Sequence, residues 1–405
     1  MIKRLLTTPV VGVAGAILVT AATVTAPRLT VPDAKGPAAA PCSNWTGAPP
    51  DSPGSIQNEV NGVTVVSACR AWLVGEYQGG NVIPLAERWN GSAWIQTKVP
   101  YGGGVVHDTF LRAVSARAAD DVWAVGDYDH GDPSFAHFSL IERWNGSSWF
   151  QVPSPNPGGP TRNNLLFGVD TLSVTSAWAV GSFSNGTALQ TLVLRWNGSA
   201  WKRVKSPSPG GTAHDSELAS ITAISATNAW AVGWYSDGQV RHTLILHWNG
   251  KTWRRTPNPN PQGCIPGDEL VSVSGTSATD VWAVGLVTGC FFVVPQMLIE
   301  HWNGKAWRTV RAPKVNSPEN ALAGVAAISA TNAWAVGTIL GGQNVNQTLV
   351  LHWNGTAWSR VTSPNPAGSA EDHFLTGVAA WSASSIWTVG DDGTGAKEAM
   401  ALHCC

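Results

Sequence analysis

Residues 334–337 read Trp-Ala-Val-Gly, and residues 353–358 read Trp-Asn-Gly-Thr-Ala-Trp. The first motif, in this or a close form, occurs seven times along the 405 residues, with its tryptophans 51 to 55 residues apart. The second motif follows each of the first six copies within 21 residues. The tryptophans that open the seven copies are Trp72, Trp123, Trp178, Trp230, Trp282, Trp334 and Trp387.

A repeat of about 50 residues built only from strand-like runs is typical of a β-propeller with one four-stranded blade per repeat. In the copy from 322 to 366, we expect strands at 322–329, 333–337, 348–353 and 358–361. Asn354-Gly355 predicts a type I′ hairpin between the last two strands. The sequence therefore predicts an all-β, seven-bladed propeller.

The ends of the repeat array predict how the ring closes. The last copy reaches a third strand at 402–404 with no Asn-Gly turn after it. Trp45 precedes Trp72 by 27 residues, close to the 29 residues between Trp358 and Trp387. We therefore expect the segment around Trp45 to complete the seventh blade, in a propeller domain that spans residues 42–405.

The N-terminal residues predict export. Lys3 and Arg4 precede a mostly apolar run over about 9–26, which is the pattern of a signal peptide. Residues 1–26 are predicted to be this peptide, and 27–41 a Pro/Ala-rich tether. An uncleaved N-terminal anchor is the alternative, and no other segment is predicted to span a membrane. We expect a secreted, extracellular protein.

Six cysteines suit an exported, disulfide-bonded protein, with unpaired thiols in a reducing compartment as the alternative. Spacing alone does not fix the pairing. The blade assignment favours Cys264 with Cys290, Cys42 with Cys404 or Cys405, and Cys69 with whichever of those two remains.

Charged residues make up 13% of the chain, and the net charge is −1. This balance argues against a nucleic-acid partner and against a polybasic membrane surface. We expect a monomer.

The repeat resembles a Kelch-type repeat. Kelch units have an apolar strand that ends in glycine, an aromatic residue in the third strand and a tryptophan near the start of the fourth. Residues 334–337, Trp353 and Trp358 match these positions. The hairpin also resembles the Asp-box turn of sialidases, without its aspartate, and the whole pattern is similar to secreted bacterial propellers built from this repeat. The resemblance implies a propeller fold and no particular activity.

Twenty of the 22 tryptophans are periodic, which favours packing between blades. Trp234 is an exception, predicted to lie in the loop between the second and third strands, where blades one to four all carry aromatic residues. Aromatic rings beside a carboxylate suit sugar stacking and hydroxyl hydrogen bonds, with local packing as the alternative. The predicted ligand-binding residues are Tyr77, Asp127, Tyr128, Phe183, Trp234 and Tyr235.

A second set of polar residues lies 15 residues before the tryptophans that open the Trp-Ala-Val-Gly motifs, at the predicted start of the innermost strands. There they would rim the central channel, where their oxygens could hold calcium or act as an acid and base pair. The alternative is capping of nearby backbone groups. The predicted rim residues are Asp108, Asn163, Asp215, Glu319 and Asp372.

These patterns predict a secreted, non-catalytic scaffold that binds carbohydrate or a cell-surface or matrix component through its loop face. No catalytic motif such as Gly-x-Ser-x-Gly occurs in the sequence. The alternatives are a protein–protein interaction scaffold at the cell surface and, third, a glycan hydrolase or lyase that uses two rim carboxylates.

Overall fold

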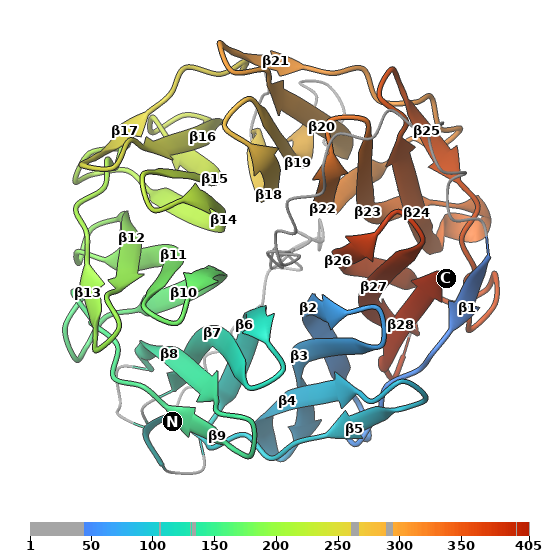
Figure 1. Ribbon diagram of the computed structural model, residues 1–405, viewed down its shortest axis with the longest axis horizontal. Helices are drawn as coiled ribbons and strands as arrows, with labels where there is room; N and C mark the ends of the chain where they lie inside the picture. Colours follow the sequence, from blue (N-terminus) through green and yellow to red (C-terminus); the bar gives the residue numbers. More distant parts are fainter. Residues whose placement is uncertain are drawn as a thin grey trace, which may run out of the picture.

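The computed structural model describes residues 44–104, 107–129, 131, 135–260, 267–288, 295–393 and 395–404. They form seven four-stranded antiparallel sheets arranged as a ring (Figure 1). The prediction of an all-β, seven-bladed propeller is confirmed. The helices of the described residues are two short 3-10 turns, η1 (Gly102–Gly104) and η2 (Gly342–Asn344), and neither could span a membrane.

Each blade runs from an innermost strand near the ring axis to a short outer strand at the perimeter (Figure 1). In blades one to seven, the innermost strands are β2 (Asn58–Ser67), β6 (Thr109–Ala118), β10 (Asn164–Ser173), β14 (Ser216–Ser225), β18 (Glu269–Ser277), β22 (Asn320–Ser329) and β26 (His373–Ser382). The second strands are β3 (Arg70–Gly79), β7 (Asp121–Asp129), β11 (Ser176–Ser184), β15 (Asn228–Ser236), β19 (Asp280–Thr288), β23 (Asn332–Leu340) and β27 (Ser385–Asp392).

The third and fourth strands form the outer half of each blade. The third strands are β4 (Asn81–Trp89), β8 (His137–Trp144), β12 (Leu189–Trp196), β16 (Arg241–Trp248), β20 (Pro295–Trp302), β24 (Asn346–Trp353) and β28 (Glu398–Cys404). The outer strands are β5 (Trp94–Gln96), β9 (Trp149–Gln151), β13 (Trp201–Arg203), β17 (Trp253–Arg255), β21 (Trp307–Thr309), β25 (Trp358–Val361) and, in blade seven, β1 (Trp45–Gly47).

The ring closes as the sequence predicts. Strand β1 pairs antiparallel with β28, which places Trp45 opposite Cys404, and the blue strand lies beside the red one in Figure 1. The predicted signal peptide and tether (residues 1–26 and 27–41) lie outside the described residues.

Cys404 is disulfide-bonded, as predicted, whereas Cys42, Cys264, Cys290 and Cys405 lie outside the described residues. Cys69 is an exposed free thiol. It sits in the turn between β2 and β3, which holds its side chain at the surface. The prediction that Cys69 forms a disulfide is therefore wrong for this structure.

The glycine of each Trp-Ala-Val-Gly motif is required by a close approach between two strands. The innermost strand β6 shifts its register between Leu111 and Ala113, opposite Gly126 on β7. A Cβ atom on Gly126 would lie 2.0 Å from the carbonyl oxygen of Phe110. Any side chain there would push the two strands apart, so the motif ends in glycine.

The tryptophans join neighbouring blades. Trp282 of blade five is fully buried, and its ring centroid lies 4.9 Å from that of Trp353 and 5.1 Å from that of Trp358 in blade six. At the closing interface Trp334 packs on Trp45 at 5.9 Å, and Cys404 takes the place of a second tryptophan. The prediction of packing between blades is confirmed for these residues, and each ring adds a large apolar contact.

The hairpin that follows the third strand of blade six differs from the predicted type. A type I′ turn needs two consecutive residues with positive φ. Gly355 has a φ of 92°, but Asn354 does not have a positive φ. The loop instead contains four residues, in which Asn354 Oδ1 accepts hydrogen bonds from the backbone N–H groups of Thr356 and Ala357 at 2.9 Å. The hairpin is confirmed, and its predicted type I′ geometry is wrong.

Candidate functional site

The predicted aromatic residues lie within the second strands rather than in the loops that follow them. Tyr77, Tyr128 and Phe183 belong to β3, β7 and β11, and both Trp234 and Tyr235 belong to β15. Strand β15 still pairs on both sides at Trp234, opposite Glu217 and Thr243. The second strands are longer than predicted because this pairing continues beyond the motif glycine.

Cationic side chains cover two of these rings. Trp234 is 8% exposed, and the guanidinium carbon of Arg241 lies 3.8 Å from its ring centre. Phe183 is 7% exposed, under Arg203 at 4.3 Å. A sugar could stack on these two rings only after displacing the arginines.

The three tyrosines are half-buried by local packing. Tyr235 stacks on His242 at 5.0 Å between ring centroids, and its hydroxyl accepts a hydrogen bond from Arg255 at 2.8 Å. Tyr128 packs against η1, where a Cβ atom on Gly102 would lie 2.2 Å from the tyrosine Cγ. Tyr77 packs against the core between blades seven and one. The local-packing alternative therefore describes these aromatic residues.

Asp127 is fully buried and already bonded. Its Oδ1 lies 2.5 Å from Nε of Arg112, and its Oδ2 lies 2.7 Å from Nδ1 of His137. Burial opposes ionisation, but Arg112 and His137 outweigh it and lower the pKa of this carboxyl. Both carboxyl oxygens of Asp127 are thus engaged within the protein, and its geometry gives no support to the predicted contact with a sugar hydroxyl.

Four of the predicted rim residues cap the preceding blade. Asp108 Oδ1 accepts a hydrogen bond from the backbone N–H of Val82, at the start of β4, at 2.7 Å. Asn163, Asp215 and Asp372 do the same at the starts of β8, β12 and β24, for His137 at 3.1 Å, Leu189 at 2.8 Å and Asn346 at 2.7 Å.

In blade six the cap shifts by one residue. The Asn320 side chain accepts from the N–H of Met297 at 2.9 Å, while Glu319 offers its backbone carbonyl to the N–H of Leu340 at 2.9 Å. The backbone-capping alternative therefore fits the rim residues better than a ligand site. Within the described residues, no group of three or more His, Cys, Asp or Glu is arranged to hold a metal ion.

A network of charged residues near the ring axis was not singled out from the sequence. Lys397 donates to Glu59 at 2.6 Å and lies 3.4 Å from Asp391. Arg241 pairs with Glu269 at 3.2 Å. Burial raises the pKa of Glu269, and it raises the pKa of Asp391 to about 6. These charges are matched within the protein.

A groove of about 700 Å³ lies at the outer side of blades five and six. On the blade-five side it is lined by His301, Asn303, Arg308, Arg311 and Lys314. The blade-six side carries the half-buried indole of Trp353, with Thr356 and Ala357 of the hairpin. An indole beside cations and an amide can stack on a sugar ring and hydrogen-bond its substituents.

Blade five lacks a polar clasp that its neighbours have. In blade six the Thr348 hydroxyl lies 2.7 Å from that of Ser363, which ties the segment after the outer strand to the third strand. Asn258 makes the equivalent bond in blade four, to Thr243 at 2.8 Å. Met297 and Ala312 occupy these two positions in blade five, and the groove lies beside this unclasped segment.

The groove continues into a charged surface that we call the basic edge. It comprises the lysines and arginines of the outer strands, and of the turns and segments beside them, in blades three to five. The prediction from sequence missed it because only positions shared by all repeats were compared. Comparing the residues that flank each fourth-strand tryptophan would have found it. The basic edge is Lys202, Arg203, Lys205, Lys251, Arg254, Arg255, Lys305, Arg308, Arg311 and Lys314.

Comparison with known proteins supports the fold alone. No protein-family model and no curated protein sequence matches the chain. The GH74 xyloglucanase of Xanthomonas campestris is similar in structure, with a TM-score of 0.54 and 13% identity over 86% of this chain. The match covers 53% of the xyloglucanase, so this chain spans about half of its length.

Two further solved structures are similar to this chain. A PL25 ulvan lyase bound to -[GlcA(1-4)Rha3S]- has a TM-score of 0.51 and 11% identity over 88% of this chain and 95% of its own. The SapL1 lectin in complex with alpha methyl fucoside has a TM-score of 0.45 and 14% identity over 81% of this chain and 99% of its own.

Proposed function

We propose that this protein is a non-catalytic carbohydrate-binding propeller whose sugar site is the groove between blades five and six. The groove itself carries the proposal, because it joins the partly exposed indole of Trp353 to the side chains of Asn303 and Arg308. Its volume of about 700 Å³ falls within the roughly 300–1,000 Å³ typical of small-ligand sites.

The loop face is a weaker candidate for the site. Arg203 and Arg241 cover the rings that were expected to stack on sugars. The rim carboxylates of Asp108, Asp215 and Asp372 each accept a backbone hydrogen bond from the preceding blade. A hydrolase or lyase would have to release such carboxylates from their structural role, which favours binding over catalysis.

The similar structures support carbohydrate as the ligand class. The two similar structures with TM-scores above 0.5 are a xyloglucanase and a lyase bound to a glycan. The alternative of a protein–protein interaction scaffold has no such support, although an exposed groove could also receive a protein side chain.

Export and family membership belong to the same proposal. Lys3, Arg4 and the apolar run that follows support an N-terminal signal, and the tryptophan positions support a Kelch-like repeat. We propose a monomer that is exported with the disulfides predicted for Cys42, Cys264 and Cys290. Detection of the processed chain in culture medium, with its N-terminus sequenced, tests export; intact residues 1–26 on a cell-bound chain would favour the anchor.

A glycan-array screen of the full chain tests the proposed function. Ala357→Tyr places a ring in the groove without changing charge, since Ala357 is exposed and lines it. Ala93→Tyr is the matched control, at the equivalent exposed hairpin position of blade one. We expect glycan binding that falls at least about tenfold in Ala357→Tyr and persists in Ala93→Tyr. An array with no bound glycan would instead favour the protein-interaction alternative.

A further inference from the structure

The basic edge concentrates positive charge in three consecutive blades. Residues 197–209, 249–260 and 303–316, which hold the outer strands of blades three to five, contain ten lysines and arginines and no aspartate or glutamate. The equivalent stretches of the other four blades contain two cations, Lys98 and Arg360. Since the whole chain has a net charge of −1, this clustering is local.

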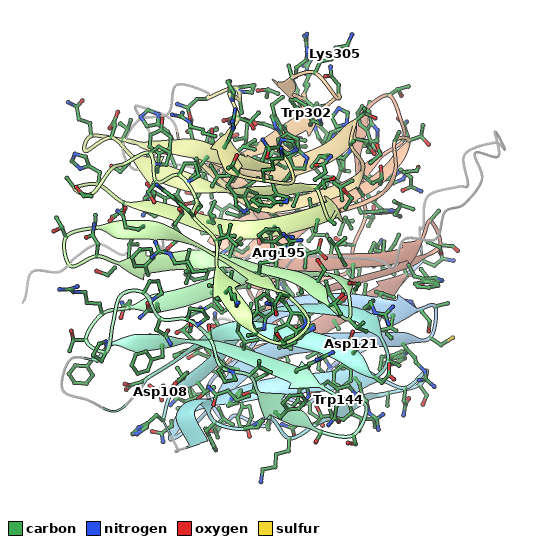
Figure 2. The ribbon with its side chains drawn as sticks, turned by 60° about the vertical axis from the view of Figure 1, so that its left-hand side comes forward. Asp108, Asp121, Trp144, Arg195, Trp302 and Lys305 are labelled. Carbon is green, nitrogen blue, oxygen red and sulfur yellow. The ribbon has the colours of Figure 1, made fainter. Side chains whose placement is uncertain are left out.

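The charges of the basic edge have no acidic partner in the part of the chain that the structure describes. All ten side chains are exposed, and no carboxylate of the described residues forms an ion pair with any of them. Figure 2 shows Lys305 pointing away from the ring at the top of the view. Arg203 and Arg255 also lie over Phe183 and Tyr235, so packing explains only these two. Mutual repulsion among the rest favours binding of an anion.

The arrangement fits a linear ligand. Outer strands β13, β17 and β21 follow one another along the perimeter of the ring (Figure 1), and the last of them borders the groove through Arg308. A single sugar would reach the cations of one blade. A chain with regularly spaced negative groups could neutralise all three blades and still seat one segment in the groove.

We propose that the ligand is a linear acidic polysaccharide, with carboxylate or sulfate groups, that runs along the basic edge and enters the groove beside Trp353. This inference rests on the proposed carbohydrate-binding function. The perimeter is convex (Figure 1), so a planar lipid bilayer would touch one blade at a time. Duplex DNA, with a persistence length of about 50 nm, resists bending around such an edge. A flexible polysaccharide can follow it.

The test compares affinities of the full chain for labelled polygalacturonate, dextran sulfate, neutral dextran and a DNA duplex by fluorescence anisotropy. Because each cation near an anionic polymer adds to the affinity, Arg308→Glu/Arg311→Glu/Lys314→Glu should weaken binding of the more tightly bound acidic polymer by about 100-fold. The control is Arg70→Glu/Lys98→Glu/Arg360→Glu, which changes the net charge equally at exposed cations elsewhere. We expect the control to bind within about threefold of the wild type, and melting curves of both variants to show that they fold.

A second variant tests the reach of the polymer. Lys202→Glu/Lys205→Glu alters blade three, away from the groove. It should weaken binding of the long acidic polymer and leave a short uronic acid oligomer unaffected.

The other outcomes separate this inference from the proposed function. Array glycans could bind while the neutral and acidic polymers bind equally well and the basic-edge variants bind as the wild type does. That result would overturn the inference and leave the proposed function standing. If the DNA duplex bound as tightly as the acidic polymers, the choice of a polysaccharide as the ligand would be overturned. If no glycan or polysaccharide of any kind bound, both would fail.

Discussion

Charged side chains occupy two different environments in this propeller, the interior near the ring axis and the outer edge of blades three to five. In the interior, Arg112 contacts Asp127, and Lys397 contacts Glu59. At the outer edge, ten cations are exposed and no described carboxylate pairs with them. The difference places several acidic groups in interior ion pairs and leaves the ten cations of the outer edge exposed to solvent.

Interior pairs are costly to break because burial removes the water that would otherwise stabilise each charge. Arg112 is 13% exposed at its side chain, and its partner Asp127 is fully buried. Burial also raises the pKa of the neighbouring Glu76 to about 8, despite the opposing effect of Arg112. The guanidinium therefore lies among the carboxyl groups of Asp127 and Glu76, with His137 on the far side of Asp127.

The largest expected effect comes from removing that guanidinium. Arg112→Ala should lower the free energy of unfolding by about 3–5 kcal/mol, since it takes the guanidinium away from the buried Asp127 carboxylate, which then contacts only His137. Arg308→Ala, at the basic edge, should change stability little because Arg308 is exposed and unpaired. Urea unfolding of the two variants measures the contrast. The double variant Arg112→Met/Asp127→Leu should recover part of the loss, and equal losses in the two single variants would contradict the comparison.

Glu142 is an interior carboxyl without a cation. Both of its oxygens are buried and lack a hydrogen-bond partner among the described residues, and burial raises its pKa from 4.5 to about 8. The same position holds Leu194, Leu246 and Leu351 in blades three, four and six. Glu142→Leu should therefore stabilise the protein at pH 8 by about 1–3 kcal/mol.

The raised pKa of Glu142 also predicts how the stability of the protein changes with pH. A carboxyl whose pKa is raised in the folded state favours folding while protonated, so its contribution is full below pH 4.5 and is lost as pH rises through about 8. The melting temperature of the wild type should fall more between pH 5 and pH 8 than that of Glu142→Leu. Glu300→Leu should gain less stability at pH 8, because Glu300 accepts a hydrogen bond from Asn258 at 3.2 Å. If the melting temperatures of the wild type and Glu142→Leu fell equally between pH 5 and pH 8, the Glu142 carboxylate would have to be stabilised by a partner.

The fold was predictable from the sequence because each part of the repeat has one local physical requirement. Gly126 is needed where β6 bulges toward β7, and Trp282 must fill the space between two blades. Closure was predictable because the spacing from Trp45 to Trp72 repeats a spacing found elsewhere in the chain.

The candidate sites were less predictable because their contacts cross between elements that the repeat pattern does not relate. Asp108 binds the backbone of Val82 in the preceding blade. Trp234 is covered by Arg241 from the adjacent strand, at a position where other blades carry no arginine. Positions that vary from blade to blade, such as those of the basic edge, disappear from a consensus of the repeats.

The smallest effect concerns the rim, at the start of the innermost strands. Asp108→Ala removes the acceptor for the N–H of Val82 and should cost about 1 kcal/mol, whereas Asp108→Asn keeps an oxygen there and should cost less. Thermal unfolding with and without calcium distinguishes this cap from the predicted calcium site. If Asp108 only caps the backbone, added calcium should leave the melting temperatures of the wild type and of Asp108→Asn unchanged. If calcium stabilised the wild type but not Asp108→Asn, the carboxylate would be binding the ion, and the rim would belong with the charges left available to a partner.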